Sequence, residues 1–277
     1  MLRIDTMQAD DVALAVDWAA REGWNPGLHD AACFHAADPR GFFVARENGR
    51  VAGFISAVAY DAAFGFIGLY IVAPDCRGRR VGIHLAQHAL SYLGPRSVGV
   101  DGVLRKIRNY AAHGFVYQCK NVRHAGLLPS AAGSAYIVPV QHVPWDTLLA
   151  YDRRHFPAAR AAFLQRWLHA PGHHGYAYLD AGTLRGYGVV RACRTGFKAG
   201  PLFADTAEIA DQLAGALGRH TQGATVYLDT PDANPAAGAL ARRYGMQEVF
   251  ATARMYRGKA PELPIHEVFG ITTFELG

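Results

Sequence analysis

The most constraining part of the sequence is residues 64–93, where a strand pattern passes through an arginine- and glycine-rich loop into a helix pattern. Phe64 to Val72 is an apolar, largely β-branched and aromatic run of strand length, and Pro74 interrupts it. From Gly82 to Leu93 the apolar residues recur at helical spacing. A strand that leads directly into a helix favours an α/β fold for this part of the chain.

The loop between these elements has the composition of an anion-binding turn. It contains three arginines and two glycines, in the order Arg77, Gly78, Arg79, Arg80, Val81 and Gly82. A loop that enters a helix presents unpaired backbone N–H groups and the positive end of the helix dipole. Glycines permit close approach of the backbone, and arginines add bidentate positive charge. These features predict a pyrophosphate ligand, although an ordinary turn with a solvated basic face would give the same composition.

Length and charge fit a protein that handles an anionic small molecule. The 277 residues suggest one large or two modest domains, and 51% of them are hydrophobic, which is ample for a core. The net charge of +5 is spread along the chain without a long basic stretch. Nucleic-acid binding would favour a basic stripe with interleaved aromatic residues, so neither DNA nor RNA is an expected partner.

Three absences in the sequence predict a cytoplasmic location and no metal. The first residues do not resemble a signal peptide, and no apolar stretch reaches about 18 residues, so we expect no membrane anchor. The four cysteines are far apart and form no CxxC pair, as expected for free buried thiols in a reducing compartment. His84 and His88 have the spacing of a metal pair, but no glutamate follows His84, and we expect no metal site.

The first half of the chain is predicted to form a complete α/β unit. Its expected strands and helices lie at residues 2–7, from about 10 to 19, 41–47, 50–60, 64–72, 82–93, 97–100, 104–113 and 114–120. Asn48-Gly49, between the second and third strands, is the strongest short hairpin signal available.

The second half repeats part of this order after a segment rich in alanine, glycine, serine and proline. Residues 175–200 are similar in pattern to residues 41–61. A helix is expected over 206–217 with a capping box made by Asp205 and Glu208, and a second helix begins at Asn234-Pro235. Duplication of a whole domain is the simplest interpretation. We expect an N-terminal domain at 1–124, a linker at 125–143 and a C-terminal domain at 144–277.

The arginine loop resembles motif A of the GNAT superfamily of acyl-CoA N-acyltransferases, Arg/Gln-x-x-Gly-x-Gly/Ala. Arg77 and Gly82 match its first and last positions, and Arg80 replaces the usual middle glycine. Tyr110 lies four residues before Gly114, as the catalytic tyrosine of the family does. The resemblance implies a tandem GNAT fold of the two-domain bacterial type. Each domain would contain a mixed, mainly antiparallel central sheet flanked by helices.

The second half resembles a degenerate copy of the same domain. It lacks the arginine loop, and it carries Asp205 and Glu208 where their charges would repel a pyrophosphate. It keeps Asn234 and a Gly245-Met246 ending similar to motif B, but Ala241 occupies the tyrosine position. The resemblance therefore assigns the acyl-CoA site to the first half.

The resemblance also implies roles for individual residues. The backbone of the strand before the loop, at Tyr70, Ile71 and Val72, would bind the pantetheine arm, with an amide of Ile71 or Val72 as oxyanion donor. Tyr110 would protonate the departing thiolate, unless its ring serves only to pack the helix. The residues expected to contact acyl-CoA in and around the loop are Arg77, Gly78, Arg79, Arg80, Val81, Gly82 and Ile83.

The general base has several candidates. Asp101 follows the expected strand at 97–100, where the sites of α/β proteins gather, but it would serve equally as the N-cap of the next helix. Asp61 is a second candidate. Deprotonation through water would need no protein base at all.

These features together predict an acetyl-CoA-dependent N-acetyltransferase. The acceptor would be a primary amine of a small molecule that attacks the thioester directly, and the second domain would shape its pocket. A non-catalytic CoA-sensing protein and a protein lysine or N-terminal acetyltransferase are the alternatives. Either a monomer or a homodimer is compatible with the sequence.

Overall fold

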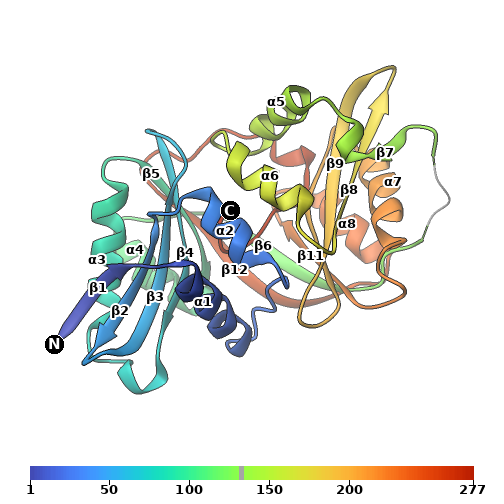
Figure 1. Ribbon diagram of the computed structural model, residues 1–277. Coiled ribbons are helices and arrows are strands. Elements are labelled where there is room, and N and C mark those ends of the chain that lie inside the picture. The colour runs from blue at the N-terminus through green and yellow to red at the C-terminus, as the bar shows by residue number, and fades with distance from the viewer. Residues whose placement is uncertain (131–133) are drawn as a thin grey trace.

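The computed structural model describes residues 1–130 and 134–277, and in this part of the chain one 13-stranded mixed sheet runs through the whole molecule. Helices cover it on both faces, and the N-terminal half (residues 1–126) lies beside the C-terminal half (residues 134–277) (Figure 1). None of the helices among the described residues is long and apolar enough to cross a membrane.

The N-terminal half contains six strands and four α-helices among the described residues. They are β1 (Leu2–Thr6), α1 (Ala9–Arg21), α2 (Asp30–Ala37), β2 (Phe42–Glu47), β3 (Arg50–Ala59), β4 (Phe64–Val72), α3 (Val81–Leu93), β5 (Ser97–Val103), α4 (Ile107–Ala112) and β6 (Val116–Gly126).

The C-terminal half contains a similar succession of elements. They are β7 (Ile137–Pro139), α5 (Trp145–His155), α6 (Ala161–His169), β8 (His173–Asp180), β9 (Thr183–Ala192), β10 (Phe197–Ala204), α7 (Ala207–Gly218), β11 (Val226–Pro231), α8 (Pro235–Arg243), β12 (Gln247–Arg257) and β13 (Val268–Gly270).

The two halves exchange their last long strands. The strand order is β1-β2-β3-β4-β5-β12-β6-β11-β10-β9-β8-β7, with β13 beside β10. Strand β12 therefore lies between β5 and β6, and it is antiparallel to both. Strand β6 in turn pairs with β11 of the other half. Figure 1 shows β6 and β12 running through the middle of the molecule. Each half thus completes its sheet with a strand from the other.

The exchange of β6 and β12 bears on the expected domain boundaries. Residue 124 lies inside β6, so a linker over 125–143 begins within a strand and also includes β7. Residues 131–133 of that proposed linker lie outside the described residues. The division into 1–124 and 144–277 stays a proposal about folding units, and it leaves β12 on the opposite side of the boundary from its partner β5.

Local sequence signals position several elements as expected. Asn48 and Gly49 both have positive φ, 51° and 82°, and they join β2 to β3. Asn234 caps α8 by accepting hydrogen bonds from the backbone of Ala236 and Ala237. The expected capping box at Asp205 and Glu208 is wrong. The N-cap of α7 is Thr206, whose hydroxyl accepts from the Ile209 amide, because the strand before it extends through Ala204.

Three large clusters of buried side chains form the core among the described residues. One packs α3 and α4 on the N-terminal half, and one packs α7 and α8 on the C-terminal half. The third is shared, since it joins Phe34 and Leu69 of the first half to Trp167 and Phe203 of the second. Helices α2 and α6 pack against each other at this junction. The junction is therefore a continuation of the hydrophobic core.

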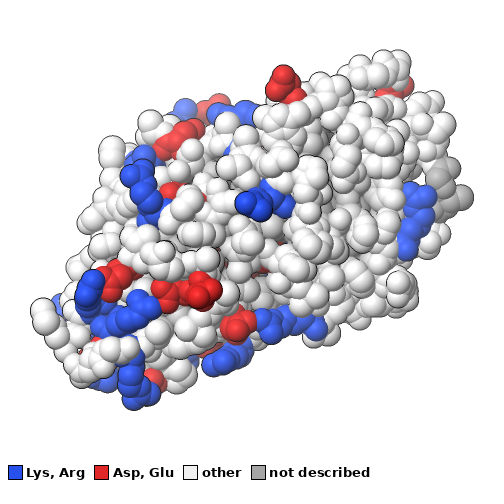
Figure 2. Space-filling view, in the orientation of Figure 1, with Lys and Arg blue, Asp and Glu red and all other residues white. Residues whose placement is uncertain are grey.

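Buried ion pairs accompany this shared core. Arg191 of β9 contacts Asp30 of α2 at 2.9 Å, and Arg123 of β6 contacts Asp229 of β11 at 2.7 Å. All four side chains are almost fully buried. A buried charge is strongly destabilising once its partner is removed. An arrangement of the halves that separated these pairs would therefore destabilise the folded state. On the outer face seen in Figure 2, by contrast, basic and acidic side chains are interspersed.

Candidate active site

The sheet of the N-terminal half opens where β4 and β5 separate. The two strands pair in parallel from Phe64 opposite Ser97 to Ile67 opposite Val100. Beyond that point both strands continue, to Val72 and Val103, without pairing with each other. Leu69 has a φ of 44°, and the register of β4 against β3 shifts beside it. A bulge therefore bends β4 away from β5 and leaves backbone groups available at the gap.

The arginine loop follows the open end of β4 and leads into α3. Gly78 and Arg80 both have positive φ, 80° and 66°, and Arg80 is the N-cap of α3. Arg80 thus adopts a left-handed conformation that suits the motif's usual glycine, at a strain cost of about 1–2 kcal/mol. The backbone geometry of the loop survives the loss of that glycine.

The three loop arginines differ in their partners. Arg77 contacts Glu22 at 2.6 Å and also donates to the carbonyl of Val72 at 3.0 Å. Arg79 contacts Glu47 at 2.7 Å. Arg80 is exposed and forms no ion pair with any described residue. Two arginines are held in place by acidic neighbours, and the third has no acidic partner among the described residues.

Gly82 allows the start of α3 to pack directly on β4. A Cβ atom at this position would lie 2.6 Å from the Tyr70 hydroxyl oxygen and 3.4 Å from a methyl of Val72. Tyr70 therefore contacts the helix through its side chain, in addition to any role of its backbone. The close approach brings the first turn of α3 next to the gap between β4 and β5.

Tyr110 of α4 lies on the same face of the sheet. Its ring covers Gly102 of β5, where a Cβ would lie 2.2 Å from the ring, and it packs edge-to-face on Phe115 at 6.0 Å. Its hydroxyl has no hydrogen-bond partner among the described residues. Burial, with smaller contributions from Tyr70 and Asp101, raises the pKa of Tyr110 to about 12. The phenol therefore stays protonated at neutral pH and can donate.

Asp101 has surroundings that argue against a role as general base. It lies inside β5, which extends to Val103, rather than after the strand or at a helix N-cap. Both of its carboxylate oxygens accept from Arg254 of β12, at 2.9 and 2.7 Å, and Asn121 of β6 donates to it at 2.8 Å. A fully buried carboxylate engaged in this way is poorly placed to accept a proton from an amine. Asp61, the other candidate, accepts two turn amides at 2.7 Å.

The equivalent gap in the C-terminal half is filled by the chain itself. Strands β10 and β11 pair in parallel only from Phe197 to Ala199, and β13 then pairs with the free part of β10. The amide of Ile271 donates to the carbonyl of Asp229 on the β11 side at 2.9 Å. Asn234 holds the same segment by donating to the carbonyls of His266 and Val268, both at 3.0 Å. A polypeptide strand occupies the position that is open in the N-terminal half.

The last seven described residues cross from one half to the other. A Cβ on Gly200 of β10 would lie 2.4 Å from the carbonyl oxygen of Ile271, and a Cβ on Gly68 of β4 would lie 1.9 Å from that of Glu275. The hydroxyl of Tyr60 donates to the carbonyl of Leu276 at 2.9 Å. The 271–277 segment is buried throughout and lies directly on β4 beside its bulge.

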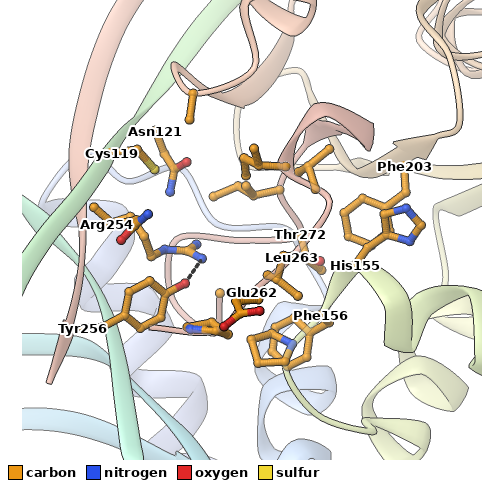
Figure 3. Close-up of a pocket in the computed structure, with 18 residues that line it drawn as sticks. Cys119, Asn121, His155, Phe156, Phe203, Arg254, Tyr256, Glu262, Leu263 and Thr272 are labelled. Atoms are coloured by element: carbon orange, nitrogen blue, oxygen red, sulfur yellow. Dashed lines mark hydrogen bonds between the residues drawn. The ribbon is translucent and has the colours of Figure 1, made fainter. Parts of the chain in front are cut away.

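A cavity of about 540 Å³ lies between the halves on this side of the sheet (Figure 3). Its volume is typical of a pocket for a small organic molecule. We call it the central cavity. Its walls come from β6, β12, the end of α5 and the residues after it, β10, the turn before α8 and the chain after residue 257. The lining residues are Gln118, Cys119, Asn121, His155, Phe156, Pro157, Phe203, Ala233, Arg254, Tyr256, Pro261, Glu262, Leu263, Ile265, Val268, Ile271, Thr272 and Gly277.

Comparison with known proteins identifies the family. A profile described as "Acetyltransferase (GNAT) family" matches residues 10–118, and one described as "Acetyltransferase (GNAT) domain" matches residues 148–270. The holothin acyltransferase of Pseudoalteromonas sp. (strain SANK 73390) is 31% identical over 265 residues, which cover 94% of this chain and 90% of that protein. The chain belongs to the GNAT superfamily and is an acyltransferase with two GNAT domains.

Solved structures confirm the tandem fold. A putative acetyltransferase from Pyrococcus horikoshii has a TM-score of 0.84 at 20% identity, covering 100% of this chain and 96% of its own. A tandem GNAT protein from the clavulanic acid biosynthesis pathway has a TM-score of 0.64 at 16% identity, with 94% and 100% coverage. Members of the family transfer an acyl group from acyl-CoA to an acceptor.

The structure brings together most of the residues singled out in the sequence. Tyr70, the arginine loop and Tyr110 surround the gap between β4 and β5, whereas Asp101 points to the opposite face and is ion-paired. Sequence reasoning missed the central cavity and its polar residues Arg254 and Tyr256. Their alternation in the strand sequence ATARMYR marks one face of β12, but nothing local indicates that β12 joins the other half.

Proposed function

We propose that this protein is an acetyl-CoA-dependent N-acetyltransferase that acts on a primary amine of a small molecule in the cytoplasm, as a monomer or homodimer. One observation carries the proposal. Two equivalent gaps exist in the sheet, and only the one between β4 and β5 is open and followed by a basic loop at a helix N-terminus. The acyl-CoA site is therefore assigned to the N-terminal half alone.

The residues around that gap have separate tasks. Backbone N–H groups at the start of α3, together with Arg80, suit the phosphates of CoA. The backbone of Tyr70, Ile71 and Val72, which does not pair with β5, suits the pantetheine arm, and an amide at Ile71 or Val72 suits the developing oxyanion. Tyr110 holds a proton beside the gap, where a departing thiolate needs one. No carboxylate is assigned as base, and the amine loses its proton to water.

The acceptor is assigned to the central cavity. Asp101, the first residue of β5 beyond its pairing with β4, is held by Arg254 and Asn121, which both line this cavity. The C-terminal half supplies Phe203 and His155 to the opposite wall (Figure 3). The acyltransferase relative acts on holothin, as its name states, which favours a small-molecule acceptor over a protein. A cavity of about 540 Å³ between two halves is also a poor match for an extended protein surface.

Calorimetry with acetyl-CoA tests the proposal. We expect one site per chain, and we expect Arg80→Glu to weaken binding by about 10- to 100-fold, because it places a negative charge where a phosphate contact is lost. Arg166→Glu is the matched control, since Arg166 is an exposed arginine of α6 in the other half. A stoichiometry of two, or equal losses in the two variants, would show that the site is misplaced.

Turnover is measured separately, as thiol release from acetyl-CoA in the presence of a panel of small amines. Release that depends on the amine supports an acetyltransferase. Binding of acetyl-CoA without release for any amine in the panel would favour a CoA-sensing protein instead.

A further inference from the structure

We infer that the central cavity recognises an uncharged carbonyl oxygen of the acceptor, through Arg254 and Tyr256, and holds the remainder of the molecule by apolar contact. This rests on the proposed acetyltransferase function, and it adds the chemical class of the acceptor. The amine would be carried by a compact, mainly apolar molecule, such as an aromatic or heterocyclic amine that bears an amide or ketone.

The polar end of the cavity has unused hydrogen-bond donors. Arg254 uses Nε and Nη2 on Asp101, and its Nη1 makes only a long contact of 3.4 Å to the Tyr256 hydroxyl (Figure 3). That hydroxyl accepts from Arg254, and its own proton has no acceptor among the described residues. Two N–H or O–H donors therefore remain at one place on the cavity wall, which is the arrangement that a carbonyl oxygen requires.

A third polar group of the cavity wall lacks a partner. Thr272 is only 3% exposed, and its hydroxyl oxygen is buried without a hydrogen bond to any described residue. An unsatisfied buried hydroxyl reduces the free energy of unfolding by about 1–3 kcal/mol, and such groups are uncommon in native proteins. Thr272 lies on the 271–277 segment, and rotation of its hydroxyl toward the cavity would let a polar atom of a bound acceptor complete its hydrogen bonding.

The charges of the cavity wall favour a neutral oxygen over a carboxylate. The positive charge of Arg254 is already matched by Asp101 at 2.7 Å. His155 is engaged on both ring nitrogens, by the Tyr151 carbonyl at 2.9 Å and by Glu267 at 2.8 Å. No uncompensated side-chain cation therefore lines the inner cavity within the described residues, and an acceptor carboxylate would lose its hydration without gaining a counter-ion.

The other walls suit an aromatic or branched apolar body. Phe156 and Phe203 face β12, the strand that carries Arg254, and Leu263 lies between the two sides (Figure 3). Ile265 and Ile271 extend the same surface. A flat apolar molecule anchored at one end by a carbonyl matches this division of the cavity into a polar end and apolar walls.

Binding of three aromatic amines of similar size tests the inference without relying on turnover. The probes are meta-aminobenzamide, which presents a neutral carbonyl, meta-isopropylaniline, which is its apolar isostere, and meta-aminobenzoate, which presents a carboxylate. Affinities are measured by calorimetry on the full chain. We expect Tyr256→Phe and Thr272→Val to weaken binding of the aminobenzamide by about 5- to 50-fold. The affinity for the isopropylaniline should change by no more than about twofold.

Tyr178→Phe is the control, because Tyr178 is a tyrosine of β8 that stacks on Tyr136 at 5.2 Å and does not line the cavity. Equal losses for the amide and its apolar isostere would overturn the inference, and so would tighter binding of the aminobenzoate than of the aminobenzamide. Both results leave acetyl-CoA binding unaffected, so they are distinct from a failure of the proposed function, which would appear as absent or misplaced acetyl-CoA binding.

Discussion

At the scale of single residues, Tyr110 combines a raised pKa with a hydroxyl that has no described partner. If it protonates the thiolate, Tyr110→Phe keeps the ring packing on Gly102 and removes only the proton. We expect turnover to fall by about 10²- to 10⁴-fold while the affinity for acetyl-CoA changes little. Stopped-flow thiol release and calorimetry on the same variant give both quantities. Unchanged turnover would leave Tyr110 with a packing role only.

His173 should make the protein sensitive to acid. Burial, with the nearby Arg191, lowers the pKa of His173 to about 4, although Asp30 acts in the opposite direction. Between that value and the ordinary pKa of about 6.5, the unfolded chain binds a proton that the folded chain does not. The free energy of unfolding therefore falls as the pH drops through this window, by up to about 1.4 kcal/mol per pH unit from this group.

Urea unfolding at several pH values measures that slope. His173→Gln removes the titrating group and should give a shallower dependence between about pH 4 and 6.5. His142→Gln, at an exposed histidine, serves as the control. Parallel curves for the wild type and His173→Gln would mean that other groups determine the acid sensitivity.

At the scale of elements, β4 and β10 each have a shift of register and a glycine where the 271–277 segment crosses the strand. Gly68 of β4 and Gly200 of β10 each lie under a carbonyl of the 271–277 segment. Alanine at either position would displace that segment, and we expect a loss of about 1–3 kcal/mol in the free energy of unfolding. Gly68→Ala should in addition raise the KM for the amine, since the displaced segment carries Thr272.

The matched control is Gly238→Ala in α8, where a new Cβ would meet only the end of the Arg242 side chain at 3.2 Å. In a helix this change should be neutral or stabilising by up to about 1 kcal/mol. Equal stability of all three variants in urea would show that the segment yields easily, contrary to its burial.

Comparison of sequence and structure at this scale separates local signals from long-range ones. Asn48-Gly49 and Asn234-Pro235 act through their own backbone geometry, so the hairpin and the helix start are predictable from a few residues. Asp101 was expected to follow a strand over 97–100. That position is wrong because β5 continues to Val103 and includes Asp101. Its last residues, up to Val103, remain in the strand since β12 pairs with them, opposite Thr252.

The residues around the active site also separate into those that a motif predicts and those that long-range strand pairing positions. The match of Tyr110 to the tyrosine position of the GNAT family predicted its place near the arginine loop, because in that family both positions follow from the order of strands and helices. The partnership of Asp101 with Arg254 joins residues 153 positions apart and depends on the exchange of strands. Pairing of this kind is set by the assembled sheet, and no local pattern specifies it.

At the scale of the whole molecule, the exchange of β6 and β12 should make the two halves fold as one unit. A fragment ending near residue 124 would lose β12 from between β5 and β6 and expose unpaired strand edges. We expect such a fragment to aggregate, and we expect the full chain to unfold in one transition with matching calorimetric and van't Hoff enthalpies. Two separate transitions, or a soluble and fully active 1–124 fragment, would contradict this.

The strand β13 in the gap of the C-terminal half has a consequence for the order of binding. Because β13 belongs to the same chain, it competes for this gap at a high effective concentration, and we expect this half to keep its filled form in the presence of acyl-CoA. The wall that it gives to the central cavity, including Phe203 of the strand beside β13, is then complete before acyl-CoA arrives. If the central cavity takes the acceptor as proposed, we expect the acceptor and acyl-CoA to bind in either order.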